Sequence, residues 1–345
     1  MSILRAHCVA LCSLVLGCGE DQTSLFVLEA FVADGPGGLL ASPGFGPENR
    51  LILATTEPPG RVGTVDRASG TPVDAAFDAF PTPHPPVALD RRIFLVTPVG
   101  RLAGYELDGT SRGLFPNEPL GRTTPPLLAP GPSLRVATTG GRLLGLDGGG
   151  ALTLDVSLSG RAAVGALVVP NGTVVTTDTG AVLFFAEDGS LSRQDMLTPP
   201  VSAPAQLSGQ VGVIAADGFQ IFDLQGNRVA SADAGGASGV VGRDGVFLVW
   251  SPDGRLRGIS ASGEATFNLS VPGLSNAGPV ALSGGRFGLV ADDGTARAIV
   301  PDGTVGAERA AVRLPTGPLV VDDTTDRVFY PSGAAVVGLD FAVPL

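Results

Sequence analysis

Side chains able to do acid–base chemistry are scarce in this sequence, and histidine is the scarcest. There are two histidines, and only His84, in the proline-rich segment Pro81–Pro86, lies outside the apolar N-terminal stretch. A Ser-His-Asp triad would have to use His84, and a zinc site with two histidines is excluded outside that stretch. No P-loop or Gly-x-Gly-x-x-Gly motif occurs. We expect His84 to be a solvated linker residue, and the sequence predicts no catalytic residue.

Carboxylates are the remaining candidates for a metal site. Asp292 and Asp293 are adjacent, and Asp322, Asp323 and Asp326 lie close together. Such groups could surround a calcium ion, which takes six to eight oxygen ligands. The first pair directly precedes a glycine, however, and Asp-Gly favours tight turns because Gly accepts positive φ and Asp hydrogen-bonds its own backbone. The second group fills the matching loop of a later repeat. We therefore expect both groups to form turns without a metal, and a bound divalent ion is the alternative.

The turns belong to a repeat that fills most of the chain. The residues that follow the first turn glycine of each unit recur every 36 to 41 positions, and they are Arg61, Arg101, Arg142, Ala181, Phe219, Arg255, Thr295 and Ala334. A second turn glycine follows about nine residues later, as at Gly109, Gly189, Gly263 and Gly303. Nine residues leave room for one strand and its turn but not for a helix of three turns.

Each unit therefore reads as four short antiparallel strands. A short apolar segment comes first, a β-branched run such as Val246–Trp250 follows, and a third segment such as Arg142–Asp147 lies between the two turns. A period near 40 residues is typical of propeller blades. We predict an all-β fold, a single β-propeller of eight four-stranded blades. The last unit lacks an outer strand, so the spare strand Ser24–Phe31 should complete it and close the ring. A seven-bladed ring is the alternative, because the first unit matches least well.

The N-terminus has the pattern of an export signal. Arg5 precedes the apolar run Cys8–Gly17, which is too short to span a bilayer and ends in Val-Leu-Gly-Cys at Cys18. This ending resembles a bacterial lipobox, which implies that Cys18 is acylated and becomes the mature N-terminus. The other two cysteines, Cys8 and Cys12, precede it, so the mature chain could form no internal disulfide. We divide the chain into a lipoprotein signal peptide (1–17), a short lipidated tether (18–23) and the propeller (24–345).

The charge of the chain argues against nucleic-acid binding. The net charge is −11, and loss of the leader, which carries Arg5 and no acidic residue, would take it to −12. Every basic residue is an arginine, and the arginines are spread along the turns instead of clustered, so no basic patch is expected for phosphate contacts.

The repeat resembles the PQQ-like (quinoprotein-like) propeller repeat, best in the segments 95–110, 136–148 and 248–263. Quinoprotein dehydrogenases of that family carry a tryptophan in most blades and a vicinal cysteine pair, whereas Trp250 is the only tryptophan here. We therefore expect no quinone or other cofactor. A lipoprotein made of one eight-bladed propeller is similar to the propeller component of the outer-membrane β-barrel assembly machinery, which is a non-catalytic scaffold.

These observations predict a non-enzymatic binding or scaffold module. We expect an exported, monomeric propeller, held at the bacterial outer membrane through lipid on Cys18 alone, whose partners are other envelope proteins, with outer-membrane protein assembly as a candidate process. The competing function is a propeller hydrolase or lactonase with a divalent metal in the central channel. Propellers host both enzymes and inert platforms, so the fold does not decide between them.

Overall fold

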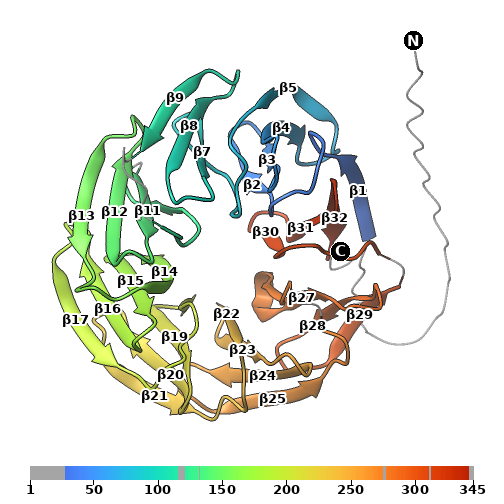
Figure 1. Cartoon of the computed structure of the whole chain (residues 1–345). Helices are drawn as coiled ribbons and strands as arrows, with labels where there is room; N and C mark the ends of the chain where they lie inside the picture. The colour runs from blue at the N-terminus through green and yellow to red at the C-terminus, as the bar shows by residue number, and fades with distance from the viewer. Residues whose placement is uncertain (1–27, 116–120, 132, 275–276, 311, 342–345) are drawn as a thin grey trace, which may run out of the picture.

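The structure is a computed structural model, and it describes residues 28–115, 121–131, 133–274, 277–310 and 312–341. These residues form eight four-stranded antiparallel sheets arranged around a central axis (Figure 1). The predicted eight-bladed propeller is confirmed, and the seven-bladed alternative is wrong. The first unit, whose sequence matches the repeat least well, forms a complete sheet like the others.

The strands of the first four blades follow the chain from the inside of each blade to the outside. They are β2 (Gly44–Phe45), β3 (Arg50–Ala54), β4 (Arg61–Asp66) and β5 (Pro72–Asp78); β6 (Val87–Leu89), β7 (Arg92–Val96), β8 (Leu102–Glu106) and β9 (Ser111–Phe115); β10 (Leu127–Ala129), β11 (Ser133–Ala137), β12 (Arg142–Asp147) and β13 (Leu152–Ser157); and β14 (Ala163–Val169), β15 (Gly172–Thr177), β16 (Ala181–Ala186) and β17 (Leu191–Met196).

Blades 5 to 7 repeat this order, and blade 8 takes its outer strand from the N-terminal part of the chain. The strands are β18 (Ala205–Leu207), β19 (Gln210–Ala215), β20 (Gly218–Asp223) and β21 (Arg228–Ala232); β22 (Gly239–Arg243), β23 (Val246–Trp250), β24 (Arg255–Ser260) and β25 (Ala265–Ser270); β26 (Val280–Ala281), β27 (Phe287–Val290), β28 (Ala296–Ile299) and β29 (Val305–Arg309); and β30 (Val320–Asp322), β31 (Arg327–Ser332), β32 (Ala335–Asp340) and β1 (Leu28–Asp34).

The ring is closed by β1, as the sequence predicts. It pairs antiparallel with β32, from Leu28 opposite Asp340 to Asp34 opposite Ala335. The described part of this strand begins and ends slightly later than the predicted segment Ser24–Phe31, whose first four residues lie outside the described residues. The single helix in the described chain is a 3-10 turn, η1 (Ser283–Gly285), so no helix there is long and apolar enough to cross a bilayer.

The apolar core is divided among the spaces between blades. Eight clusters of buried apolar side chains occupy the eight interfaces between neighbouring blades. The closing interface is built like the rest: Ala33 and Phe329 of blade 8 pack against Leu51 of blade 1. The middle strands are therefore covered on both faces, which explains why runs such as β23 are continuously apolar.

Turn glycines join the blades at the outer rim. The glycine between the third and fourth strands has positive φ and lies directly against an apolar side chain of the preceding blade. A Cβ added at Gly109 would meet the ring of Phe77 at 2.7 Å, and one at Gly150 would meet Phe115 at 2.5 Å. These glycines therefore serve the turn and also let the next blade approach closely.

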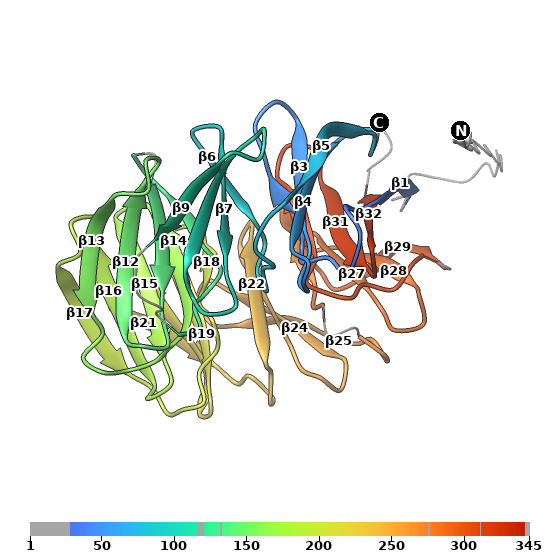
Figure 2. The same cartoon turned by 45° about the horizontal axis from the view of Figure 1, so that its top comes forward.

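The turns gather at two ends of the ring axis (Figure 2). We call the hairpin end the one with the turns between the first and second and between the third and fourth strands. The connection end carries the turns between the second and third strands and the links from blade to blade. Because strands alternate in direction, the two sets of turns cannot share an end.

We expect Gly109→Ala to lower the free energy of unfolding by about 2 to 4 kcal/mol, because it adds a steric clash with Phe77 to the cost of a left-handed backbone. Gly245→Ala is the matched control, since Gly245 has a similar φ (94° against 88°) and nothing within 4 Å of an added Cβ. It should cost only the backbone term of about 1 to 2 kcal/mol. Urea titrations of both variants measure the difference, and equal costs would mean that the contact with Phe77 contributes nothing.

Candidate functional site

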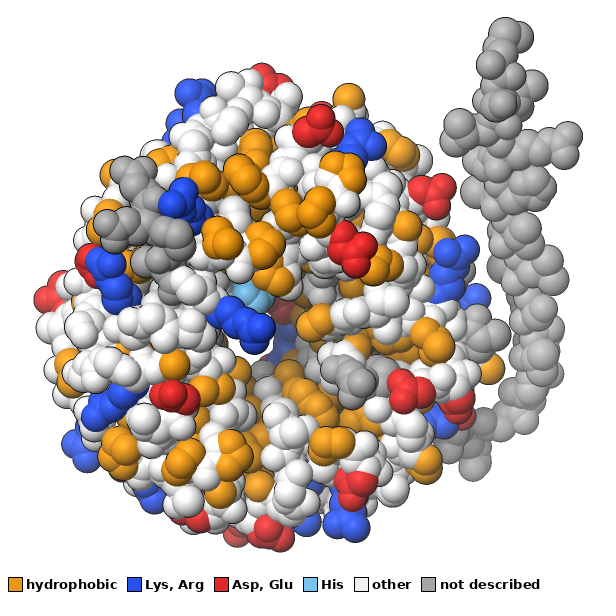
Figure 3. Space-filling view, viewed as in Figure 1, with side chains coloured by type: hydrophobic (Ala, Val, Ile, Leu, Met, Phe, Trp, Pro, Cys, Tyr) orange, Lys and Arg blue, Asp and Glu red, His pale blue; other side chains and the backbone are white. Residues whose placement is uncertain are grey.

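The centre of the ring is an open channel lined by the first strand of each blade. Figure 3 looks onto the connection end and shows the hollow at the axis. Toward the hairpin end the channel widens into a cavity of about 840 Å³, bounded by blades 5 to 8 and by Phe45 of blade 1. Its wall combines apolar side chains such as Phe45, Val241 and Val320 with the polar Gln206 and Ser208. A cavity of this size can hold a small organic ligand.

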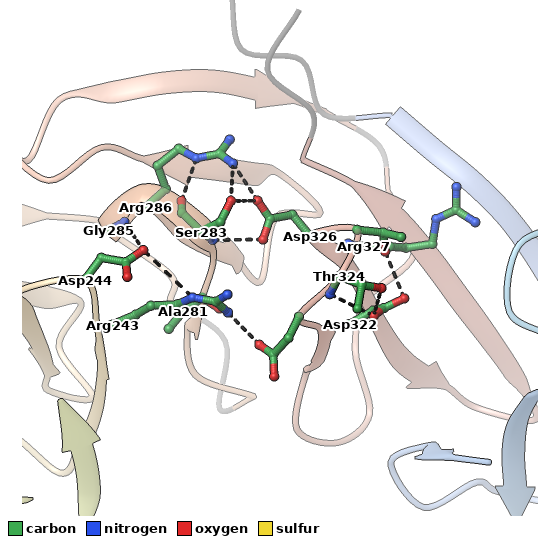
Figure 4. Close-up of polar contacts among 12 residues, drawn as sticks. Arg243, Asp244, Ala281, Ser283, Gly285, Arg286, Asp322, Thr324, Asp326 and Arg327 are labelled. Atoms are coloured by element: carbon green, nitrogen blue, oxygen red, sulfur yellow. Dashed lines mark hydrogen bonds and ion pairs between the residues drawn. The ribbon is translucent and has the colours of Figure 1, made fainter. Parts of the chain in front are cut away.

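Three charged residues, Arg243, Asp244 and Asp323, line this cavity. Among the described residues, the eight innermost strands contain two charged residues, Arg243 at the end of β22 and Asp322 at the end of β30. The Nη1 of Arg243 lies 2.6 Å from the Oδ1 of Asp323, two blades away, and 3.5 Å from the carbonyl oxygen of Ala281 in the blade between them (Figure 4). Arg243 thus spans three blades at the edge of the cavity.

Asp322 organises the turn that follows β30. Its carboxylate accepts hydrogen bonds from the backbone N–H and hydroxyl of Thr324 and from the hydroxyl of Thr325, and Arg67 of blade 1 lies 3.3 Å away. Burial raises the pKa of Asp322, but the hydrogen bonds from Thr324 and Thr325 and the charge of Arg67 outweigh it, so the pKa lies below its ordinary value. The side chain is buried and fully occupied by protein groups.

Asp326 ties blade 8 to blade 7. Its carboxylate accepts hydrogen bonds from the backbone N–H of Ser283 (2.8 Å) and from the Ser283 hydroxyl, and it pairs with Arg286 at 2.6 Å (Figure 4). Arg286 also donates to the carbonyl oxygen of Phe341. Both side chains of this ion pair are 11% exposed. The η1 turn and the turn between β30 and β31 are therefore held together by a largely buried pair.

Asp292 and Asp293 lie at the opposite end of the ring from Asp322–Asp326. They form the turn between β27 and β28 at the connection end, and the Oδ1 of Asp293 accepts the N–H of Thr295 at 2.8 Å. Hydrogen bonds from the side chain and backbone of Thr295 lower the pKa of Asp293. This is the predicted turn role. The two aspartate groups do not converge, and the described residues hold no cluster of three or more His, Cys, Asp or Glu arranged for a metal ion.

His84 differs from the expected solvated linker residue. Its backbone N–H donates to the hydroxyl of Thr82, and its Nε2 lies 2.8 Å from the carbonyl oxygen of Thr123 in the next interblade link. Burial lowers the pKa of His84, because the charged form would lose hydration. His84 lies in an interblade link, as expected, but its ring is half-buried against a loop 39 positions later in the chain instead of fully solvated. His84 joins two loops at the connection end.

Arg243 and Arg286 are the functional candidates that the sequence analysis missed. The arginines were expected to be spread along turns, yet Arg243 ends an innermost strand. The corresponding strands of six other blades end in apolar residues, for example Leu89, Ala129, Val169 and Leu207, and that of blade 8 ends in Asp322. An aligned comparison of the eight units would have singled out this position. Cys18, the predicted lipidation site, lies outside the described residues.

The connection end carries an apolar surface over blades 1 and 2, visible as a broad hydrophobic area in Figure 3. Leu39, Phe80 and Val99 are 46%, 43% and 56% exposed there, and exposed prolines at 58, 59, 83 and 98 surround them. We call these residues the blade 1–2 surface. Apolar surfaces of this kind mark sites of interaction more often than isolated exposed residues do.

Comparisons with known proteins support the fold and no more specific assignment. No protein-family model matches the sequence, and no curated protein does. Among solved structures, BamB from Moraxella catarrhalis matches with a TM-score of 0.73 at 15% identity over 92% of this chain and 99% of that chain. The computationally designed Ika8 protein matches with 0.73 at 15% identity over 91% and 99%, and the C-terminal WD40 domain of Sif2 with 0.67 at 12% over 92% and 99%. The match to BamB confirms the predicted resemblance in architecture.

The ion pair of Arg286 and Asp326 should be a measurable source of stability. We expect Asp326→Asn to lower the free energy of unfolding by about 2 to 4 kcal/mol, because it leaves a largely buried guanidinium without its counter-charge. Asp323→Asn is the control, since the Asp323 side chain is 77% exposed, and it should change stability by no more than about 0.5 kcal/mol. Chemical denaturation measures both, and equal effects would contradict the structural role given to Asp326.

Proposed function

We propose that this protein is a non-catalytic, lipid-anchored propeller that binds other proteins of the bacterial envelope through its blade 1–2 surface. The partners that we propose are subunits of the outer-membrane β-barrel assembly machinery. The observation that carries the proposal is this exposed surface, with Leu39, Phe80 and Val99 at its centre. The candidates for chemistry, in contrast, are engaged within the fold: His84 with Thr123, Asp322 with Arg67 and Asp326 with Arg286.

The blade 1–2 surface is held in shape before any partner arrives. The N–H of Phe80 donates to the Tyr105 hydroxyl at 3.0 Å, and the N–H of Thr82 donates to the carbonyl oxygen of Thr55 at 2.9 Å. The hydroxyl of Thr82 in turn donates to the carbonyl oxygen of His84. Prolines further restrict the backbone of these loops. A partner would therefore lose little affinity to ordering the loops.

The surface is also nearly uncharged on an acidic protein. Within the segments 55–60, 79–86 and 97–100, Glu57 is the only acidic residue, no arginine occurs, and burial favours neutral His84. A partner therefore need not be basic, and an apolar partner surface fits this site best. Charged side chains border this surface, as where Arg61 lies 3.7 Å from Asp78.

The position of β1 agrees with anchoring through Cys18. Nine residues lie between Cys18 and Leu28, and the ten steps from one Cα to the other span at most about 35 Å when fully extended. β1 lies at the rim beside blade 1 (Figure 1). Its first residue, Leu28, pairs with Asp340 at the hairpin end, so an anchor there would leave the blade 1–2 surface, at the connection end, facing away from the tether and open to a partner. The lipobox pattern and the resemblance of the repeat to the propeller of the assembly machinery support the envelope as the location.

We expect the mature protein to begin at an acylated Cys18 and to sediment with outer membranes. Intact mass spectrometry of protein purified from membranes of a bacterial host measures the mature N-terminus and its acyl chains. Cys18→Ser should abolish acylation and release the propeller from the membrane fraction, because one hydrophobic anchor is removed and the rest of the described chain offers no spanning helix. An unmodified Cys18 in the mature chain would disprove the anchor.

The partner should depend on the blade 1–2 surface. We expect the wild-type protein to recover β-barrel assembly subunits from detergent-solubilised membranes, and the double variant Phe80→Asp with Val99→Asp to lose them by ten-fold or more, since buried carboxylates disfavour an apolar contact. Leu191→Asp is the control, because Leu191 is 52% exposed on an outer strand far from this surface. Quantitative mass spectrometry identifies the recovered proteins. Equal recovery by all three would place the interface elsewhere, and recovery of unrelated proteins would contradict the assembly role.

A further inference from the structure

The position of Arg243 breaks the rule that the innermost strands follow. These strands read Gly-Phe, Val-Ala-Leu, Leu-Leu-Ala and similar apolar runs in other blades. Arg243 instead places a guanidinium at the cavity of about 840 Å³ near the hairpin end. Local departures of this kind from an otherwise consistent pattern are expected at functional sites. Asp322, the other charged residue of these strands, is buried and turned to Arg67, so Arg243 is the charged group of the inner strands that the cavity presents.

The partner of Arg243 is well suited to be displaced. Asp323 lies in the turn after β30, and its side chain is 77% exposed, whereas that of Arg243 is 23% exposed. An exposed carboxylate retains most of its hydration and contributes little to an ion pair. The guanidinium is held independently by the carbonyl oxygen of Ala281 at 3.5 Å, and the carboxylate of Asp244 lies 4.0 Å from its Nε. Arg243 can therefore keep its place when Asp323 swings into solvent.

Beyond Arg243 and its carboxylate partners, the wall carries apolar side chains. Phe45, Val241 and Val320 are half-buried and bound the cavity with apolar side chains. Asp323 and Asp244 lie at the exposed hairpin end, where a ligand would enter from solvent. With Asp323 displaced, the guanidinium of Arg243 beside these apolar side chains is complementary to a molecule with an apolar body and a single anionic head. Arg243 offers the planar pair of donors that suits a carboxylate.

We propose that this cavity binds a small amphipathic monocarboxylate, whose carboxylate replaces Asp323 on Arg243 and whose apolar body lies along Phe45, Val241 and Val320. The site is separate from the blade 1–2 surface, which lies at the other end of the ring. It therefore does not rest on the proposed protein-binding function, and either can fail without the other. Binding involves no covalent step: one carboxylate exchanges for another on the same guanidinium.

Isothermal titration of the purified full chain in detergent-free buffer tests the site, with octanoate as the anionic probe and octan-1-ol as its uncharged counterpart. We expect one octanoate to bind per chain. Asp323→Asn should tighten octanoate binding by about two- to five-fold, because the competing ion pair is an exposed one. Arg243→Gln should weaken it by about ten-fold or more, because a charge-assisted hydrogen bond is lost. Neither variant should change binding of octan-1-ol.

Arg257→Gln is the matched control. Arg257 lies in β24 of the same blade, is 24% exposed, and pairs with Asp233 at 3.0 Å outside the cavity. It should leave octanoate affinity unchanged. Thermal melting of each variant checks that the ring is intact. The proposal is overturned if octanoate fails to bind both the wild type and Asp323→Asn, if Arg243→Gln keeps wild-type affinity, or if Arg257→Gln weakens binding as much as Arg243→Gln does.

Discussion

The structure depends on the contact between one blade and the next. A single four-stranded sheet has apolar side chains on both faces and cannot cover either alone. The eight clusters of the core therefore lie between blades, and each sheet is stable only with a neighbour on each side. An open stack would leave two such faces in water, and ring closure removes both. Glycines at the outer turns make the approach possible, because any larger residue at Gly109 or Gly150 would push the next blade away.

This packing determines where chemistry and recognition can occur. Side chains of the middle strands pack in the interfaces between blades. Residues that can contact other molecules therefore lie in the channel and at the two ends of the ring. At the hairpin end, carboxylates and arginines link neighbouring blades, as Asp326 does with Arg286 and Asp244 with the N–H of Gly285. At the connection end, prolines and exposed apolar residues take their place over blades 1 and 2. The two ends therefore present different chemistry to solvent.

Sequence reasoning succeeded where the determinants are local. The blade number, the antiparallel strands, the Asp-Gly turns and the closing strand all follow from residues within one unit or from its missing fourth strand. The sequence did not predict the side-chain contacts between residues of different blades. Arg243 and Asp323 are 80 positions apart, and Arg286 and Asp326 are 40 apart, so no local pattern pairs them. His84 was assigned to solvent because Thr123, its partner in the next loop, lies in a different unit. Cys18 stays a prediction, since it lies outside the described residues.

The pairing of β1 with β32 makes completion of the fold a late event. Leu28 meets Asp340, so the earliest strand to emerge during synthesis must wait for almost all of the remaining chain before it has a partner. Contacts of such long sequence separation slow folding. A chain that terminated before β32 would leave β1 without a pairing partner. Its unpaired backbone would then be open to proteolysis and to pairing with other chains. The pairing of β1 with β32 can therefore form only after synthesis has passed β32.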